Sequence, residues 1–242
     1  MNFNPNASLE ELMAEAESRY SVAFEPVTVG DTSLQILQIA DMGAHLEKLA
    51  QQSAPARGIE LPFWAKIWPA SLVLAHFMLR MPPEGKKALE IGAGVGVPGL
   101  FAAASGFKVT LTDASDDALL FARINILKNG LQDRAEIRFA DFTASELGEK
   151  FDYMLCAECL YRPEYYRGLI KFLLRHLRKD GRAEAVIARD YNRKAEKFFK
   201  LAEPEFEMAE KTIGAKSAPG DEDGGAERHL VSIHRLRPRK HA

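Results

Sequence analysis

A glycine turn behind a short apolar run constrains the fold of this chain more than any other feature. The run covers residues 88–91 and is followed by Gly92, Gly94 and Gly96, and Pro98 comes shortly after, a residue suited to the first turn of a helix. Glycine adopts backbone angles that a Cβ forbids, and it lets a ligand approach the main chain closely. The N–H groups at the start of the helix can bind a polar ligand. The sequence therefore predicts a strand–turn–helix unit that binds a nucleotide.

Strand and helix signals alternate through most of the remaining chain. The expected strands cover residues 87–91, 108–112, 135–140, 153–157, 183–188, 206–213 and 229–236. The expected helices in this part cover residues 70–80, 98–106, 115–128, 163–177 and 193–202. Repeated strand–helix units predict a parallel sheet with helices on both faces. No helix separates the last two strands, so we expect them to form an antiparallel pair at the sheet edge. The predicted fold class is α/β, with a Rossmann-like, mostly parallel sheet of seven strands.

The first 60 residues form a predicted N-terminal extension, ahead of a domain over residues 61–242. Ser8 and Glu11 have the spacing of a capping box at the start of a helix over residues 8–19. A β-hairpin is expected around Gly30, followed by a helix over about 41–51 and a loop over 53–58. We expect this α/β extension to serve as an accessory layer or a lid.

Composition and charge limit the kinds of partner. The 242 residues are 47% hydrophobic and carry a net charge of −2, which is ordinary for a globular protein and unlike the clustered positive charge of a broad nucleic-acid surface. No apolar run approaches the roughly 20 residues of a membrane span. Residues 1–8 lack a basic region followed by an apolar core, so no signal peptide is expected. We expect a cytoplasmic protein without nucleic-acid or membrane partners; the sequence does not specify its oligomeric state.

The chain has two cysteines, Cys156 and Cys159, in a CxxC spacing. Redox CxxC motifs place the first cysteine just before a helix, which lowers its pKa. Here Cys156 closes an apolar, strand-like run instead, and no second pair of Cys or His follows to complete a zinc site. We therefore interpret both cysteines as structural and expect no metal site.

The turn fits two kinds of nucleotide cofactor. Residues 94–99 also satisfy the GxGxxG pattern of dinucleotide-binding proteins, and both cofactor types use an acid after the second strand, here Asp113, to bind the ribose hydroxyls. Three features favour S-adenosylmethionine, with S-adenosylhomocysteine as product. Glu90 lies at the end of the first strand, beside the position of the cofactor's amino-acid moiety. Asp141 follows the third strand, where a carboxylate can accept a hydrogen bond from the adenine amino group. The strands end in an antiparallel pair, not in a second mononucleotide-binding half.

A structural alternative stands beside each of these carboxylates. Glu90 could cap its own loop, although an unpaired carboxylate in an apolar strand is costly. Asp113 could cap the helix that begins near Ser115. Asp141 could serve a turn.

The motifs resemble a known family. They are Phe63-Trp64 with Trp68-Pro69, LEIGAG at 89–94, LTDAS at 111–115, Asp141-Phe142, and Ala157-Glu158-Cys159-Leu160-Tyr161. Together they resemble the seven-strand protein-lysine methyltransferases of methyltransferase family 16, with nicotinamide N-methyltransferases as more distant relatives. The resemblance covers about residues 60–190. It implies an S-adenosylmethionine-dependent enzyme.

The resemblance also implies site residues. The family's cofactor-contacting tryptophan matches Trp68, whereas Trp64 is expected in the core. The aromatic residue after the third strand is usually tryptophan and is Phe142 here. The complete set expected to bind the cofactor is Trp68, Glu90, Gly92, Ala93, Gly94, Gly96, Asp113, Ala114, Asp141, Phe142 and Ala157.

The family's Asp-x-x-Tyr motif corresponds to Glu158 and Tyr161, and the longer carboxylate keeps the charge but displaces it by about one methylene. We expect this pair to orient an amine for methyl transfer while water or a weak base takes the proton. Positioning is the main catalytic resource for such a reaction. A lysine side chain of a protein is the favoured acceptor. The alternatives are a small-molecule N-methyltransferase, whose closed pocket the first 60 residues would complete, and a binding module that has lost catalysis.

Overall fold

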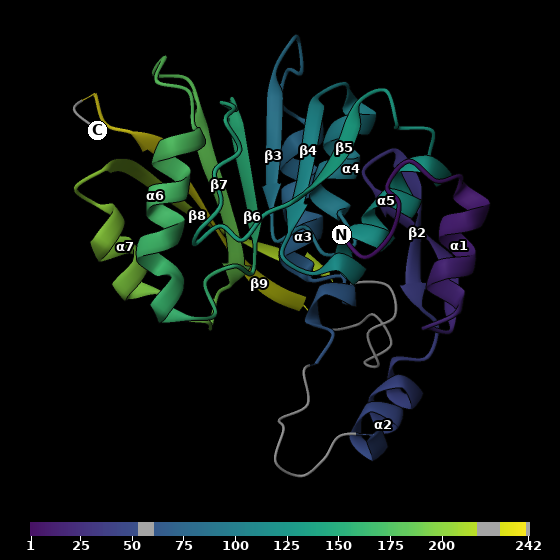
Figure 1. The fold of residues 1–242 in the computed structure, drawn as a ribbon. Coiled ribbons are helices and arrows are strands. Elements are labelled where there is room, and N and C mark those ends of the chain that lie inside the picture. The colour runs from purple at the N-terminus through teal and green to yellow at the C-terminus, as the bar shows by residue number, and fades with distance from the viewer. Residues whose placement is uncertain (53–60, 217–227, 241–242) are drawn as a thin grey trace.

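The computed structural model describes residues 1–52, 61–216 and 228–240, and its centre is a seven-stranded sheet (Figure 1). The strands are β3 Lys87–Ile91, β4 Lys108–Asp113, β5 Ala135–Phe139, β6 Tyr153–Ala157, β7 Glu184–Asp190, β8 Phe206–Lys216 and β9 Arg228–Pro238. Their spatial order is β5-β4-β3-β6-β7-β9-β8. The first five are parallel, and β9 runs antiparallel between β7 and β8. The predicted fold class and its antiparallel final pair are confirmed.

Helices cover both faces of the sheet because strand residues alternate between two cores. The helices of the domain are α3 Pro69–Leu79, α4 Val97–Ser105, α5 Asp116–Lys128, α6 Tyr166–His176 and α7 Glu196–Ala202. Leu111 and Leu155 belong to the core under α3, α4 and α5, whereas Ile91 and Cys156 belong to the core under α6 and α7 (Figure 1). The carboxyl ends of β3 to β7 therefore meet at one uncovered edge, where α/β proteins bind ligands.

The N-terminal extension packs beside this sheet as an accessory layer. It consists of α1 Leu9–Glu17, the hairpin of β1 Val22–Val29 and β2 Thr32–Ile39, and α2 Met42–Gln52. The predicted capping box of Ser8 and Glu11 is present. Ile36 and Leu37 are buried in the same core as α4 and α5, and the Leu37 N–H donates to Asn125 Oδ1 on α5 at 2.7 Å. In Figure 1, α2 projects away from the body of the fold. The loop predicted over 53–58 lies outside the described residues.

Three predicted boundaries differ from the structure by three residues each. The helix expected over 163–177 begins as a short 3-10 turn, Pro163–Tyr165, before α6. The helix expected from 193 begins at Glu196, because the Arg193 N–H turns back to donate to the Asp190 carbonyl. The loop expected from 214 begins later, because β8 stays paired with β9 as far as Lys216, and its remainder lies outside the described residues. Within the ranges that the structure describes, no helix has the length and apolar character needed to cross a membrane.

Candidate active site

The glycine turn after β3 has the backbone conformation that its sequence predicts. Gly92, Gly94 and Gly96 have φ values of 61°, 55° and 87°, in the left-handed region that favours glycine. A Cβ on Gly94 would collide with the main-chain oxygen of Trp64. Gly92 is exposed although Ala93 beside it is buried, so the main chain at the strand end is open to a ligand.

Asp113 ends β4 next to this turn. Its Oδ2 accepts the Gly94 N–H and its Oδ1 accepts the Ser115 N–H, both at 2.9 Å. Burial raises the pKa of Asp113, and the backbone hydrogen bonds partly offset that effect. Each carboxylate oxygen retains a lone pair, and the neighbouring Ala114 is exposed. The carboxylate can thus accept the two ribose hydroxyls of S-adenosylmethionine, and the site fits that cofactor.

Glu90 lies below the turn with its side chain in the protein interior. It is 2% exposed, and its Oε2 accepts the Gly99 N–H at 2.8 Å. Burial raises the pKa of Glu90 to about 8. The carboxylate therefore supports the first turn of α4, which is the structural alternative considered for it. A contact with the cofactor's amino-acid moiety stays a prediction.

Asp141 and Phe142 follow β5 at the same edge. Asp141 Oδ1 accepts hydrogen bonds from the Thr143 N–H at 2.8 Å and from its hydroxyl at 2.6 Å, so Asp141 caps a turn. The half-buried Phe142 ring lies edge-on to Tyr165, with ring centroids 6.0 Å apart. Asp141 therefore has the structural role in a turn that was the alternative for it. Contacts of Asp141 and Phe142 with adenine stay predictions.

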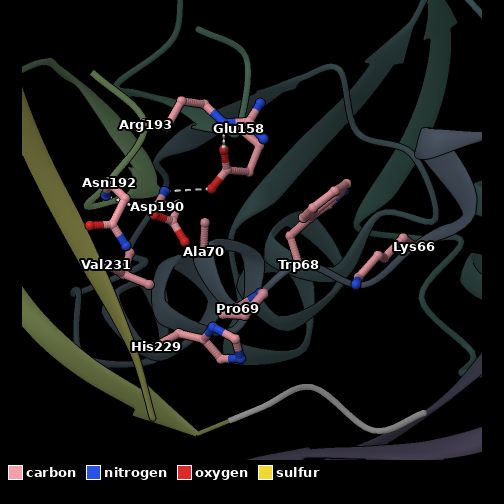
Figure 2. A pocket seen from close by; sticks show the side chains of 10 residues that line it. All are labelled: Lys66, Trp68, Pro69, Ala70, Glu158, Asp190, Asn192, Arg193, His229 and Val231. Carbon is pink, nitrogen blue, oxygen red and sulfur yellow. Dashed lines mark hydrogen bonds and ion pairs between the residues drawn. The ribbon is translucent and has the colours of Figure 1, made fainter. Parts of the chain in front are cut away.

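A cavity of about 470 Å³ opens near the carboxyl ends of β6 and β7, at the start of α3 (Figure 2). It is lined by Lys66, Trp68, Pro69, Ala70, Glu158, Asp190, Asn192, Arg193, His229 and Val231. Trp68 is the N-cap residue of α3, and its indole Nε1 donates to the Phe63 carbonyl at 3.3 Å. Figure 2 shows the Trp68 ring and the Glu158 carboxylate on neighbouring walls. The structure thus brings these two predicted residues together, whereas the glycine turn is not part of this lining.

Trp64 is partly buried and packs against the core. Its ring centroid lies 4.9 Å from that of Phe121 and 5.8 Å from that of Tyr20. The two tryptophans therefore serve different purposes: Trp64 joins the N-terminal extension to α5, and Trp68 faces the cavity.

Glu158 has the most unusual environment at this edge. With φ at 55°, it is the one non-glycine residue of the described chain with positive φ, a strain that often marks functional sites. Its Oε1 accepts the Asp190 N–H at 2.6 Å, and its Oε2 lies 3.4 Å from Arg193 Nε. Burial raises the pKa of Glu158, and the nearby Arg193 guanidinium opposes that shift. Ala157, just before it, ends β6 opposite Ala188 of β7.

Tyr161 does not share the cavity with Glu158. Its side chain is 56% exposed, and its ring centroid lies 6.4 Å from that of Tyr165. The structure therefore brings Glu158 and Trp68 to one cavity and leaves Tyr161 outside its lining. A joint action of Glu158 and Tyr161 on one amine stays a prediction.

The motifs did not indicate the opposite wall of the cavity, which comes from the turn after β7. Asp190, Asn192 and Arg193 lie there, and buried Arg189 fixes their main chain. Arg189 Nη1 donates to the carbonyls of Asp190, Tyr191 and Arg193 at 3.2, 3.2 and 2.7 Å. The sequence signal that could have indicated this wall is the charged pair Arg189-Asp190 at the end of the buried strand β7. Asp113 at the end of β4 is a signal of the same kind.

Comparisons with known proteins agree with this geometry. Residues 62–205 match the family described as lysine methyltransferase. The chain belongs to this family. Membership confirms the predicted resemblance and the S-adenosylmethionine cofactor.

Individual relatives act on different groups. A histidine protein methyltransferase 1 homolog of Dictyostelium discoideum is 29% identical over 48% of this chain and 40% of its own length. The protein N-terminal and lysine N-methyltransferase efm7 of Schizosaccharomyces pombe is 27% identical over 71% of this chain and 76% of its own. The chain spans about half the length of the first curated relatives it matches.

Solved structures share the fold. A tRNA (uracil-54, C5)-methyltransferase of Pyrococcus abyssi, in complex with S-adenosyl-L-homocysteine, has a TM-score of 0.52 and 17% identity. The match covers 88% of this chain and 44% of that one.

Proposed function

We propose that the protein is an S-adenosylmethionine-dependent methyltransferase that modifies the side-chain nitrogen of a lysine in a protein. The observation that carries this proposal is the cavity that the buried Glu158 carboxylate and the Trp68 ring both line, at the edge that also holds Asp113. Membership of the lysine methyltransferase family supports it.

The cofactor supplies a methyl group that its sulfonium already activates. The chain's own task is therefore to hold two reactants in line, and a good alignment is worth several orders of magnitude in rate. Asp113 and the turn at Gly92 and Gly94 hold the cofactor side by hydrogen bonds and close main-chain approach.

The acceptor side provides charge and an apolar wall. A buried carboxylate binds an ammonium through charge-assisted hydrogen bonds, and it also raises the pKa of the amine. Glu158 thus captures and orients the lysine, and water takes its proton. The face of the Trp68 ring accepts a cation, as the Lys66 Nζ placed 5.2 Å from its centroid illustrates.

The rim of the cavity favours a protein over a small molecule. Phe63 lies beside Trp68 and Tyr191 lies between Asp190 and Asn192 in the chain, and the two are 61% and 49% exposed. The hairpin of the N-terminal extension packs along α5, and no residue of the described part of the extension, 1–52, lines the cavity. Large exposed apolar side chains around a charged cavity suit a polypeptide that lies across it.

A cytoplasmic location is part of the proposal. Cys156 and Cys159 are both buried free thiols. Free thiols are typical of proteins in reducing compartments.

The test is transfer of a labelled methyl group from S-adenosylmethionine to heat-treated lysate proteins. Acid hydrolysis and amino-acid analysis then identify the modified residue. We expect methyl-lysine in protein with the wild type, a strong loss with Glu158→Gln, and no change with the exposed control Glu196→Gln. Label on histidine, arginine or small molecules would contradict the proposed acceptor, and no transfer at all would contradict the proposed activity.

A further inference from the structure

One oxygen of Glu158 lacks a hydrogen bond although it is buried. Oε1 is taken by the Asp190 N–H, whereas Oε2 is one of two buried side-chain oxygens in the described chain without a hydrogen-bond partner. The side chain of Glu158 is only 9% exposed. A buried carboxylate oxygen left in this way is costly, so Oε2 is the atom of this site best suited to accept a hydrogen bond from a ligand.

Arg193 covers this oxygen loosely. Its Nε lies 3.4 Å from Oε2, and its side chain is 39% exposed. Elsewhere in the protein a buried carboxylate is paired tightly: Arg235 donates to Glu184 from Nη2 at 2.7 Å and from Nε at 2.9 Å. The contrast shows that Arg193 compensates the charge of Glu158 without satisfying its hydrogen bond (Figure 2).

The main chain of Arg193 is fixed even though its side chain is loose. Its carbonyl accepts a hydrogen bond from Arg189 at 2.7 Å, and its N–H donates to the Asp190 carbonyl at 3.1 Å. Arg189 itself is buried. The guanidinium of Arg193 can therefore swing away from Glu158 by side-chain rotation while the turn keeps the Asp190 N–H on Oε1.

We propose that Arg193 is a specificity-determining residue, whose guanidinium covers Oε2 of Glu158 until the cationic side chain of the acceptor replaces it. The identification of that acceptor as lysine rests on the proposed function. When a cationic acceptor replaces the Arg193 guanidinium, the buried charge of Glu158 stays compensated. A neutral acceptor that displaced the guanidinium would leave the Glu158 carboxylate as an uncompensated buried charge. The site thus selects acceptors that arrive charged, and its own arginine competes with them.

The test uses n-butylammonium chloride as a mimic of the lysine side chain and 1-butanol as a neutral control. Titrations at constant ionic strength and about pH 8 keep the ammonium protonated. Binding is followed by the indole N–H signal of Trp68 in NMR spectra. The variants are Arg193→Gln, the charge-preserving Arg193→Lys, and Lys194→Gln, which removes a charge from an exposed neighbour in the same turn.

We expect Arg193→Gln to bind n-butylammonium roughly threefold to tenfold more tightly than the wild type, because the internal competitor is gone. Arg193→Lys and Lys194→Gln should stay within about twofold of the wild type, a difference too small to reflect a lost ion pair. Butanol should bind equally weakly to all four proteins. Unchanged or weaker ammonium binding by Arg193→Gln, or an equal gain for butanol, would overturn the inference.

This titration needs neither cofactor nor methyl transfer, so it separates the two proposals. Tighter ammonium binding by Arg193→Gln without any methyl-lysine formation by the wild type would overturn the proposed function and leave the role of Arg193 intact. Methyl-lysine formation by the wild type, together with unchanged ammonium affinity in Arg193→Gln, would support the proposed function and overturn the role of Arg193.

Discussion

The edge of the sheet where the carboxyl ends of β3 to β7 meet has two regions, one around the glycine turn and one around Glu158, and they are built differently. On the proposed cofactor side, the Asp113 carboxylate accepts main-chain N–H groups of Gly94 and Ser115, so the glycine turn and Asp113 form one hydrogen-bonded unit. On the proposed acceptor side, the Glu158 side chain after β6 meets the Asp190 N–H and the Arg193 guanidinium, both from the turn after β7. A shape made by the main chain is rigid and tolerates little change, whereas a charged cavity made by side chains can change its selectivity without loss of the fold.

The two halves should therefore be separable by mutation. A change in the glycine turn should abolish cofactor binding, and a change at Glu158 should abolish transfer alone.

The largest expected effect is that of Gly94→Ala. The new Cβ would meet the main-chain oxygen of Trp64, which cannot move aside, at a φ of 55°. We expect affinity for S-adenosylhomocysteine to fall by roughly 100-fold or more and the free energy of unfolding to fall by about 3 kcal/mol. Calorimetry and urea unfolding measure these changes.

Gly85→Ala is the matched control for Gly94→Ala. Its φ is 68°, yet nothing lies within 4 Å of the added Cβ. It should cost only about 1 kcal/mol of stability and leave cofactor affinity unchanged. Equal effects of the two substitutions would show that close approach at Gly94 is unimportant.

Glu158→Gln should have the next largest effect. The glutamine oxygen still accepts the Asp190 N–H, so the cavity keeps its shape while the charge is lost. We expect kcat/KM for protein methylation to fall by roughly 100-fold. Affinity for S-adenosylhomocysteine should stay within about twofold of the wild type. Transfer kinetics at saturating cofactor measure the first effect, and an unaltered rate would remove Glu158 from the mechanism.

The pH dependence of stability tests the role of Glu90, whose carboxyl group accepts the Gly99 N–H beneath the glycine turn. The pKa of Glu90 rises from 4.5 to about 8 on folding, so between these values the folded protein holds a proton that the unfolded chain has released. The free energy of unfolding should therefore fall as pH rises across this window, by up to about 1.4 kcal/mol per pH unit, and level off above it.

Glu90→Gln should remove this contribution, because an amide does not titrate. Urea unfolding of the variant and the wild type from about pH 5 to about pH 9 tests it, with the exposed Glu196→Gln as control. A parallel decline in wild type and Glu90→Gln would show that Glu90 titrates normally in the folded protein.

Tyr161→Phe should have the smallest effect. The hydroxyl is lost from an exposed side chain outside the cavity lining, while the ring contact with Tyr165 remains. We expect methyl transfer to fall by about fivefold to tenfold, the worth of one hydrogen bond to an acceptor. Rates equal to the wild type would place Tyr161 outside the catalytic machinery.

The strand, the glycine turn and the position of Asp113 in the proposed cofactor half could be predicted from the sequence because their signals are local. Strand, turn and acid lie within a few residues of each other around Gly92 and Asp113, and the order of parallel strands brings them to one edge. The same local reasoning found the antiparallel final pair. What it could not decide was the direction of a side chain: Glu90 turned inward to Gly99 because that N–H needed an acceptor in the core.

The acceptor half was predicted only in part because its contacts are distant in sequence. Glu158 was identified by its motif, but its neighbour Asp190 lies 32 residues away, and His229 arrives only through the antiparallel return of β9 beside β7. Tyr161 does not line the cavity with Glu158, the motif did not indicate the left-handed turn at Glu158, and the joint action of the pair stays a prediction. Such turns depend on packing rather than on a local pattern.

Calorimetric titration with S-adenosylhomocysteine of the wild type, Asp113→Ala and Glu158→Gln tests the separation of the two halves most directly. The structure predicts saturable binding of similar affinity by the wild type and Glu158→Gln, and loss of binding by Asp113→Ala. Loss of binding by Glu158→Gln, or full binding by Asp113→Ala, would contradict it.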